Sequence, residues 1–269
     1  MRRYNRWVAS LVVLAVVFAA CSTVPVTGRK QLSLISQSEM LSMSYAQYGE
    51  FVKTNKMSTN SQQVQMVRTV GTKIQKAVET YFAQKGLSDA LANYKWEFNL
   101  VESKDVNAWC MPGGKVVVYT GILPVTKTET GLAVVMGHEI AHAVAEHGSE
   151  RMSQEMLAQL GGAALSAALQ NKPEETKALW STVFGIGAQY GVLLPFSRTH
   201  ESEADHLGLI FMAMAGYNPN EAVSFWTRMA QSSGGASVPE FMSTHPSDET
   251  RIADIKNLLP DAMQYYKGK

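Results

Sequence analysis

The hydrophobic positions of the chain follow a helical period over most of its length. In residues 60–86 the apolar side chains recur every three or four positions, and a glycine ends the run. Residues 36–54 show a similar spacing after two serines, which are typical of a helix start. From about residue 128 onward the pattern is helical almost to the end. The chain is therefore predicted to be mostly helical.

Two short segments have the pattern of β-strands instead. In residues 95–103 apolar and polar side chains alternate, and residues 115–123 form a second, β-branched run. Residues 106–114, between them, end in Pro-Gly-Gly and are predicted to form a loop. The two strands are expected to pair antiparallel across this loop. The predicted fold class is therefore α+β, predominantly helical, with a small antiparallel sheet.

The first twenty residues are unlike the rest. Three arginines precede an uncharged apolar run, as in a secretory signal, and the run is too short for a comfortable membrane span. The run closes in FAAC on Cys21, which resembles the lipobox of bacterial lipoproteins, although Phe18 replaces the usual Leu, Val or Ile. Residues 1–20 are thus predicted to be a lipoprotein signal peptide and residues 21–37 a lipid-anchored tether. An ordinary signal peptide with an incidental cysteine is the alternative.

The whole chain has the composition of a folded protein, and residues 38–269 are predicted to form a single domain. Hydrophobic residues make up 46% and charged residues 17%, which argues against disorder. A net charge of +1 gives no basic field for nucleic acid. Removing residues 1–20 takes away three arginines and no acid, leaving 21 basic and 23 acidic residues, a balance that suits an envelope protein. Acylation of Cys21 leaves Cys110 as a single thiol without a disulfide partner.

Residues 156–195 contain two apolar segments with a polar stretch between them. The first is shorter than the roughly twenty residues that a membrane span needs. The second contains Ser181 and Gln189 and is broken at Pro195. Helices that belong to the core or cover a cleft are therefore favoured over membrane-spanning ones.

Candidate chemistry is concentrated in GHEIAHAVAEH, on a helix predicted over about 128–147. His138 and His142 are four residues apart, so both imidazoles lie on one face and can bind one Zn²⁺. Glu139 lies at the edge of that face, where it can act as general base on a metal-activated water. The alternative is a pair of surface histidines, but the flanking residues are apolar, and buried imidazoles need partners.

A catalytic zinc needs a third protein ligand, and His147 is the nearest candidate. A continuous helix rotates His147 about 140° away from the face of His142. The metzincin pattern also requires a glycine and a histidine where this chain has Ala145 and Gly148. His147 is therefore rejected as a ligand unless the helix breaks before it, and a histidine near a helix C-terminus is the preferred interpretation.

A better third ligand lies on a second helix, predicted over about 198–215. Glu201 and Asp205 are four residues apart and share a face. Glu201 can bind the metal, and Asp205 can accept the free N–H of a ligating histidine. Glu203 is rotated about 160° from both and is expected to face elsewhere. The apolar sequence that follows favours a buried helix over a solvated acidic face.

These motifs together resemble the gluzincin zinc metallopeptidases of the HtpX and CAAX-prenyl-protease type, in particular their soluble bacterial lipoprotein members and mitochondrial inner-membrane relatives. The matching stretches are PVTGRKQLSLIS, DVNAWCMPGGKVVVYTGIL, GHEIAHAVAEH, SRTHESEADHLGLIFMAMAGYNP and STHPSDETRI. The resemblance implies a zincin fold with one Zn²⁺ and with Glu201 as the third ligand. The family's membrane-spanning segments are not apparent here, so a prenylated substrate is not implied.

The resemblance also implies a substrate-binding strand. In zincins an edge strand above the metal pairs with the extended substrate, and Val116, Val117 and Val118 are the candidates for that strand. Asn107 and Ala108 are expected at its rim, where backbone groups can bind a peptide by β-addition. A plain hairpin is the alternative.

Two residues near the C-terminus complete the expected site. His245, in STHPSDETRI, is expected to approach the metal and to stabilise the oxyanion of the tetrahedral intermediate. The alternative for His245 is an ordinary Thr-His-Pro helix start. Arg251 is expected to anchor that turn through a carboxylate.

The predicted function is a zinc-dependent endopeptidase of the bacterial cell envelope, tethered by Cys21. Its expected partners are protein or peptide substrates, namely unfolded or misassembled envelope proteins, which only the resemblance implies. Because Ser22 is not an aspartate, the outer membrane is favoured. The rival hypothesis is an envelope chaperone or assembly factor with a latent site, covered by residues 156–195 as a lid. The oligomeric state and the roles of Cys110 and His147 stay open.

Overall fold

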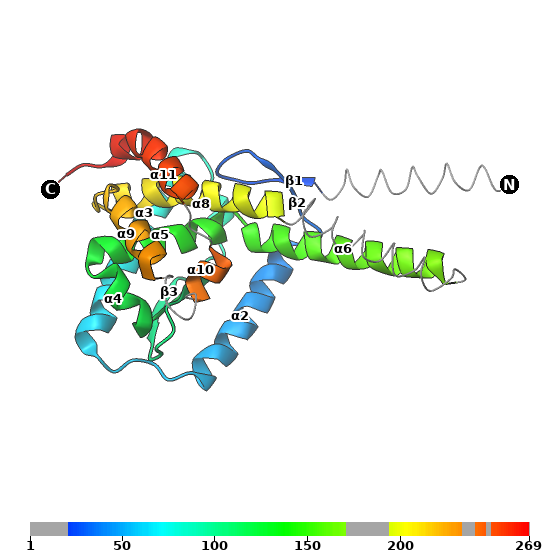
Figure 1. Cartoon of the computed structure of the whole chain (residues 1–269), viewed down its shortest axis with the longest axis horizontal. Coiled ribbons are helices and arrows are strands. Elements are labelled where there is room, and N and C mark those ends of the chain that lie inside the picture. Colours follow the sequence, from blue (N-terminus) through cyan, green and yellow to red (C-terminus); the bar gives the residue numbers. More distant parts are fainter. Residues whose placement is uncertain (1–20, 171–193, 233–239, 246–248, 269) are drawn as a thin grey trace.

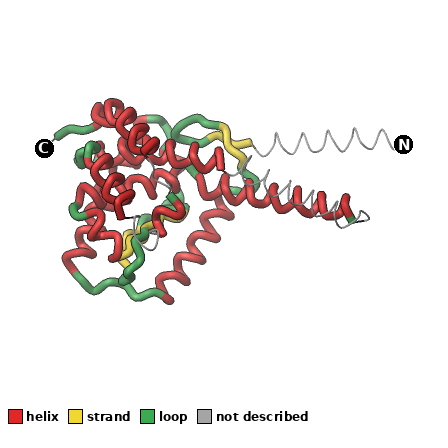
Figure 2. The backbone as a smooth tube through the Cα atoms, in the orientation of Figure 1, coloured by secondary structure: helices red, strands yellow, loops and turns green. Residues whose placement is uncertain are grey.

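The computed structural model describes residues 21–170, 194–232, 240–245 and 249–268. In these ranges helices dominate and pack around one central helix, while strands form two small sheets (Figure 2). The helices are α2 (Gln37–Thr54), α3 (Ser61–Gln84), α4 (Leu123–Thr126), α5 (Glu129–Val144), α6 (His147–Leu169), α8 (Leu194–Met214), α9 (Glu221–Ser232), α10 (Glu240–Thr244) and α11 (Glu249–Ala262). The strands are β1 (Cys21–Thr23), β2 (Lys30–Leu32), β3 (Glu97–Val101), β4 (Ala108–Met111) and β5 (Lys115–Tyr119). Short 3₁₀ helices cover Ser88–Leu91, Thr120–Ile122 and Met263–Tyr265.

The first two helices begin where their polar residues predict. The Ser36 side chain accepts a hydrogen bond from the Glu39 backbone, and the Glu39 side chain accepts one from the Ser36 backbone, a reciprocal capping box that starts α2. Asn60 caps α3 by accepting from the backbone N–H of Gln63. The helices predicted over residues 36–54 and 60–86 are confirmed by these two elements.

Helix α5 is the centre of the fold (Figure 1). Nearly all of its residues are buried, because α3, α8, α9 and β4 pack around it. Thr128 caps its start by accepting from the Gly131 backbone, and the helix ends at Val144, three residues before the predicted end. A helix that is apolar on every side is expected to be buried on every side, so the apolar flanks of the histidine motif are explained.

Two glycines let α5 and α8 approach each other at backbone distance. A Cβ atom on Gly208 would lie 2.9 Å from the backbone nitrogen of His138, and one on Gly137 would lie 2.9 Å from the Gly208 oxygen. Any side chain at either position would push the helices apart. This close crossing places the carboxylates of α8 next to the histidines of α5.

The larger sheet differs from the prediction in both order and direction. Its strand order is β3-β5-β4, with β3 parallel and β4 antiparallel to β5, so the sheet is mixed. The segment predicted as a loop contains β4, and the Pro-Gly-Gly turn joins β4 to β5. The connection from β3 to β5 is therefore the crossover that a parallel pair requires. The expectation of an antiparallel pair was wrong.

The predicted substrate strand was also wrong in its position. Val116, Val117 and Val118 lie in β5, the middle strand, and each is 0% exposed. Both backbone edges of β5 are already paired, since Val116 faces Phe98 on one side and Cys110 on the other. An incoming peptide cannot pair with a strand whose two edges are occupied. Within the described residues, β3 and β4 are the strands at the two ends of this sheet.

The stretch expected to be a tether contains a short hairpin that packs on the domain. Strands β1 and β2 pair antiparallel, with Ser22 opposite Gln31. Val24 is fully buried in the main hydrophobic core, and Gln31 is only 3% exposed. Figure 1 shows this hairpin beside the ends of α6 and α8. The predicted signal peptide, residues 1–20, lies outside the described residues.

Helix α6 extends away from the rest of the fold (Figure 1). Its apolar side chains Met156, Leu157 and Leu160 are 41%, 43% and 63% exposed. The described part of the segment 156–195 therefore neither joins the core nor covers a cleft, contrary to expectation, and residues 171–193 lie outside the described residues. No helix among the described residues is long and apolar enough to cross a membrane.

Candidate metal centre

The two histidines of the α5 motif point to one place, as their spacing predicts. His138 Nε2 and His142 Nε2 are 3.0 Å apart. His138 is 2% exposed, so its imidazole is removed from bulk water, whereas the His142 side chain keeps 15% exposure. One helical turn between the two residues is what brings both rings to the same side of α5.

Helix α8 adds a carboxylate to both histidines. Glu201 Oε2 lies 3.3 Å from His138 Nε2, and Glu201 Oε1 lies 3.3 Å from His142 Nε2. On the far side of the first ring, Asp205 Oδ1 lies 3.0 Å from His138 Nδ1. The structure thus brings Glu201 to the shared point of the imidazoles and Asp205 behind one of them, where the sequence places them.

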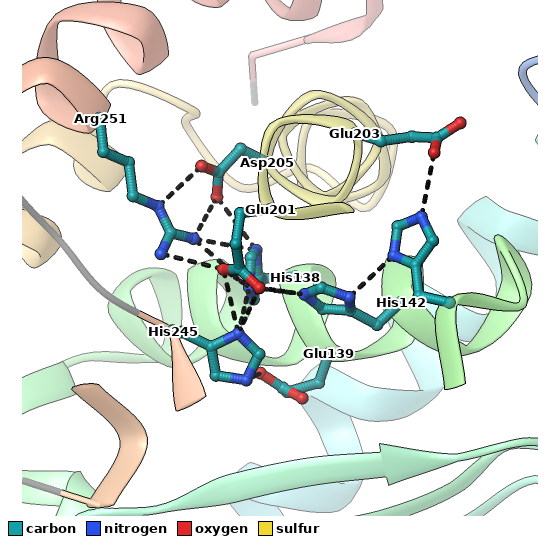
Figure 3. A network of polar contacts seen from close by, with 9 residues as sticks. His138, Glu139, His142, Glu201, Glu203, Asp205, His245 and Arg251 are labelled. Carbon is teal, nitrogen blue, oxygen red and sulfur yellow. Dashed lines mark hydrogen bonds and ion pairs between the residues drawn. The ribbon is translucent and has the colours of Figure 1, made fainter. Parts of the chain in front are cut away.

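His245, at the end of α10, joins this cluster more closely than expected. Its Nδ1 atom lies 2.9 Å from Glu201 Oε1 and 3.2 Å from His138 Nε2. Its Nε2 atom lies 3.4 Å from Glu139 Oε1. Figure 3 shows the four side chains of His138, His142, Glu201 and His245 directed at one another.

The residues present fit a zinc ion. Each of the four offers one ligand atom, and these atoms all lie within 4.8 Å of one another. Two histidines and one glutamate are a known ligand set of catalytic zinc, and tetrahedral Zn–N distances of ~2.0–2.1 Å place donor atoms ~3.3 Å apart. The observed separations of 3.0 Å between the imidazoles and 3.3 Å from each to Glu201 agree with that geometry.

Comparison with known proteins identifies this arrangement. Residues 69–259 match the model of Peptidase family M48. The chain belongs to peptidase family M48. The match includes both α5 histidines and the α8 carboxylates. Because M48 enzymes are zinc metallopeptidases, zinc is the cofactor that the His-His-Glu-His cluster of this chain would take.

Individual relatives of this M48 chain come from mitochondria and from bacteria. Mitochondrial metalloendopeptidase OMA1 of Schizosaccharomyces pombe is 37% identical over 190 residues, covering 70% of this chain and 53% of the relative. The Saccharomyces cerevisiae OMA1 is 29% identical over 276 residues, covering 94% and 76%. The beta-barrel assembly-enhancing protease of Yersinia pestis is 30% identical over 166 residues, covering 60% and 34%. The chain thus spans about half the length of the first relative and a third of the bacterial one.

Glu139 has the environment of a proton acceptor. It is 4% exposed, and its Oε1 atom accepts no hydrogen bond from the described residues. Burial raises the pKa of the Glu139 carboxyl above its ordinary value. A carboxylate that is poorly solvated binds a proton more readily, which is the property that a general base needs.

The ligand cluster of the M48 site is strongly coupled electrostatically. Burial opposes the ionisation of Glu201, but its contacts with His138, His142 and His245 hold the pKa of its carboxyl far below the ordinary value. Burial lowers the pKa of His142, while contacts with Asp205 and Glu201 overcome burial at His138 and raise its pKa to about 9. A metal ion entering the site therefore has to displace a proton from His138.

Arg251 binds a carboxylate, as expected, but within the site itself. Its Nε and Nη2 atoms each donate to Asp205 at 2.8 Å, and its Nη1 atom lies 3.1 Å from Glu201 Oε2. The guanidinium also lies 3.7 Å from the centroid of the Trp226 ring. Arg251 thus links α11 to both carboxylates of α8.

His147 does not sit near the end of a continuous helix, so that interpretation was wrong. Helix α5 ends at Val144, Glu146 adopts a left-handed conformation with φ 59°, and His147 begins α6. This break turns His147 back under the site, where its Nδ1 atom lies 2.8 Å from His142 Nδ1. His147 is 1% exposed. It contacts the back of the His142 ring and is not one of the four residues of the cluster.

Glu203 faces away from the cluster, as its rotation on α8 predicts, but it is not solvated. Its Oε2 atom lies 3.0 Å from His147 Nε2 and accepts from Arg29 Nε at 2.8 Å. Sequence reasoning missed this group because no glycine marks the turn at Glu146. The available signal was the cost of burying a histidine without a partner.

The residues expected at the substrate strand have separate places in this M48 fold. Ala108 begins β4 and is 2% exposed, and the Asn107 carbonyl accepts from the Tyr119 backbone at 3.1 Å. The backbone of Val106, just before them, accepts from Phe241 at 3.1 Å. Strand β4 packs against α5, so its residues lie beside the helix that carries the histidines.

Proposed function

We propose that this chain hydrolyses peptide bonds inside protein substrates at the α5–α8 centre, with zinc held by His138, His142 and Glu201. The observation that carries the proposal is the convergence of these three donor groups beside a buried, poorly solvated Glu139. Zinc in such a site supplies Lewis-acid activation of a water and of the scissile carbonyl.

The protein's own residues would perform the proton transfers and the positioning. Glu139 takes a proton from the attacking water and delivers it to the leaving amine, which its raised pKa favours. Asp205, 3.0 Å from His138 Nδ1, holds the tautomer of His138 whose Nε2 atom faces the cluster. Arg251 keeps Asp205 ionised by donating two hydrogen bonds to it.

Peptide substrate would bind by adding a strand to the outer edge of β4. This strand ends the sheet among the described residues and lies next to α5. Asn107 and Ala108 stand at its start, so they would contact the peptide backbone near the metal. For His245 to stabilise an oxyanion, its ring would have to leave the position 2.9 Å from Glu201 that it now holds.

A Glu139→Gln variant tests the hydrolytic mechanism. Loss of the base is expected to lower the rate on an unfolded protein substrate by a factor of about 10²–10⁴, while the zinc content is unchanged. The matched control is Glu221→Gln in α9, a carboxylate 26% exposed and paired with Arg228. Equal rates for Glu139→Gln and the parent, at equal zinc content, would refute the mechanism.

The envelope location is a separate part of the proposal. The lipobox-like FAAC ending at Cys21 supports a lipid anchor, and the similarity to the Yersinia pestis beta-barrel assembly-enhancing protease supports envelope proteins as substrates. Incorporation of labelled palmitate during expression of the full chain is the test. Cys21→Ser is expected to abolish the label and Cys110→Ser to keep it. Undiminished labelling of Cys21→Ser would refute the proposal that Cys21 carries a lipid anchor.

One observation favours a second candidate, an envelope chaperone or assembly factor with a latent site. With His245 in the cluster, four protein groups surround the metal position, whereas a catalytic zinc keeps one position open. Complementation by Glu139→Gln separates the candidates. Full rescue of a deletion phenotype by Glu139→Gln would favour the chaperone, and failure to rescue would favour the peptidase.

A further inference from the structure

A buried series of polar contacts begins at His142, and its members take no part in the proposed proton transfers. His147 Nδ1 lies 2.8 Å from His142 Nδ1, and His147 Nε2 lies 3.0 Å from Glu203 Oε2. Arg29 Nε donates to the same Glu203 oxygen at 2.8 Å. The contacts therefore run from α5 through α6 and α8 to Arg29, in the turn that joins β1 to β2. Figure 3 shows the part of this path that lies between His142 and Glu203.

The order of donors and acceptors along this series of contacts fixes one tautomer of His142. Glu203 is a carboxylate and only accepts, so the proton on the His147 ring lies on Nε2. The Nδ1 atom of a neutral His147 then accepts, and the proton between the two rings belongs to His142 Nδ1. His142 Nε2 keeps its lone pair, and this atom faces His138 Nε2 at 3.0 Å. This is the tautomer that a metal ligand requires.

A second set of contacts holds the His147 ring in place. His200 stacks on it with ring centroids 4.4 Å apart and planes inclined by 17°. His200 Nε2 lies 3.0 Å from Glu150 Oε2, and Arg29 Nη2 donates to the same oxygen at 2.7 Å. Arg29 thus lies between two carboxylates, each of which holds one histidine. His147, Glu150 and His200 are at most 2% exposed, so water cannot replace these contacts.

We propose that Arg29 is a positioning residue of the metal site. Together with Glu203 and His147, it fixes the tautomer and the orientation of His142, so tight metal binding requires the N-terminal hairpin to be seated. The proposal rests on the proposed function in one respect, namely that His142 is a zinc ligand. It goes beyond that function by assigning a role in metal binding to a segment more than a hundred residues away in sequence.

The hairpin is connected to this region through more than one residue. The Thr27 hydroxyl donates to the second oxygen of Glu203, and Gln31 Nε2 donates to Glu146 Oε2 at 2.9 Å. Glu146 is the left-handed residue that turns the chain between α5 and α6. The same hairpin therefore contacts both the carboxylate behind His147 and the turn that brings His147 under His142.

Zinc affinity of the full chain, measured by competition with a colorimetric chelator, tests the proposal. Arg29→Met and His147→Phe are expected to weaken zinc binding by about 10–100-fold, the usual effect of losing a group that orients a ligand. The visible absorption spectrum of the Co²⁺-substituted protein should change in both variants, because it reports the ligand geometry. Arg29→Lys keeps the charge and is expected to recover part of the affinity.

Arg228→Met is the matched control, because Arg228 is 22% exposed, Arg29 is 21% exposed, and each donates to a glutamate at 2.7 Å. It is expected to bind zinc like the parent, with an unchanged Co²⁺ spectrum. The proposal is overturned if folded Arg29→Met and His147→Phe bind zinc within two-fold of the parent. If Arg29→Met does not fold, His147→Phe decides in the same way. A parent chain that binds no zinc would instead refute the proposed function.

Discussion

The two α5 histidines of the candidate metal centre are held from behind by two different sets of polar residues. Behind His138, Asp205 Oδ1 lies 3.0 Å from Nδ1, and Arg251 donates twice to Asp205 at 2.8 Å. Behind His142, a second imidazole comes first, followed by Glu203 and Arg29. Each group ends in a carboxylate and a guanidinium, but the second contains one more residue and reaches a different part of the fold.

The difference follows from where each ring lies on α5. His138 faces the crossing with α8, where α11 brings an arginine that is 8% exposed. His142 lies one turn later, close to the end of α5, where the chain turns and the hairpin packs. The group behind His138 is therefore assembled by the core itself, whereas the group behind His142 depends on an N-terminal segment whose arginine is 21% exposed.

Arg251→Met should have the largest effect on stability. It leaves the buried Asp205 and Glu201 without their cation, which typically costs ~3–5 kcal/mol in the free energy of unfolding. Arg29→Met should cost less, since its side chain is partly solvated. Urea unfolding of both variants without metal measures the difference. An equal or larger loss for Arg29→Met would contradict the distinction between the two groups.

Gly208→Ala should disturb both groups at once. The added Cβ would lie 2.9 Å from the His138 backbone, so α5 and α8 have to separate, at a cost of ~1–3 kcal/mol. Zinc affinity should fall as well, because Glu201 moves with α8. Gly148→Ala in α6 is the control, since no atom lies within 4 Å of its Cβ, and alanine there should be neutral or stabilising by up to ~1 kcal/mol. Thermal unfolding with and without zinc distinguishes them.

Glu146→Val should affect only the group behind His142. Glu146 has φ 59°, a conformation that costs a β-branched residue ~1–2 kcal/mol, whereas asparagine tolerates it. Both Glu146→Val and Glu146→Asn change the group that accepts a hydrogen bond from Gln31. The difference between their unfolding free energies therefore measures the cost of the left-handed backbone conformation at this position. If the two variants are equally stable, the turn does not depend on the left-handed residue.

The smallest expected effect is the pH dependence of Glu203. Burial alone would raise the pKa of the Glu203 carboxyl, but hydrogen bonds from His147, Thr27 and Arg29 together lower it from 4.5 to about 2. A lowered pKa stabilises the fold above pH ~4.5, and this stabilisation is lost as the pH falls toward 2. The stability deficit of Glu203→Gln should therefore be constant from pH 7 to 5 and shrink below that. Chemical denaturation at several pH values measures it, and a deficit that stays constant down to pH 3 would contradict the assignment.

The site was largely predictable because its residues lie at helical spacings. The four-residue steps from His138 to His142 and from Glu201 to Asp205 place each pair on one face, and the structure brings the two faces together. His245 could be expected near the site only through the family resemblance. Its position inside the cluster depends on α10, a short helix without a distinctive spacing.

The sheet was less predictable because a strand pattern does not specify a partner. The alternation in residues 95–103 indicates a strand, and β3 is found there. The order of β3, β4 and β5 depends on which backbone edges meet, and Val116 to Val118 look the same in sequence at an edge or in the middle. The short β4, with its cysteine and tryptophan beside a Pro-Gly-Gly turn, had the composition of a loop.

The sequence by itself determined which donor groups share a helix face, because side-chain spacing on a helix is a local property of 3.6 residues per turn. Tertiary structure alone decided what stands behind His142. Arg29, which lies between Glu150 and Glu203, joins segments that are more than a hundred residues apart. Such contacts depend on how helices pack, and no local pattern encodes that packing.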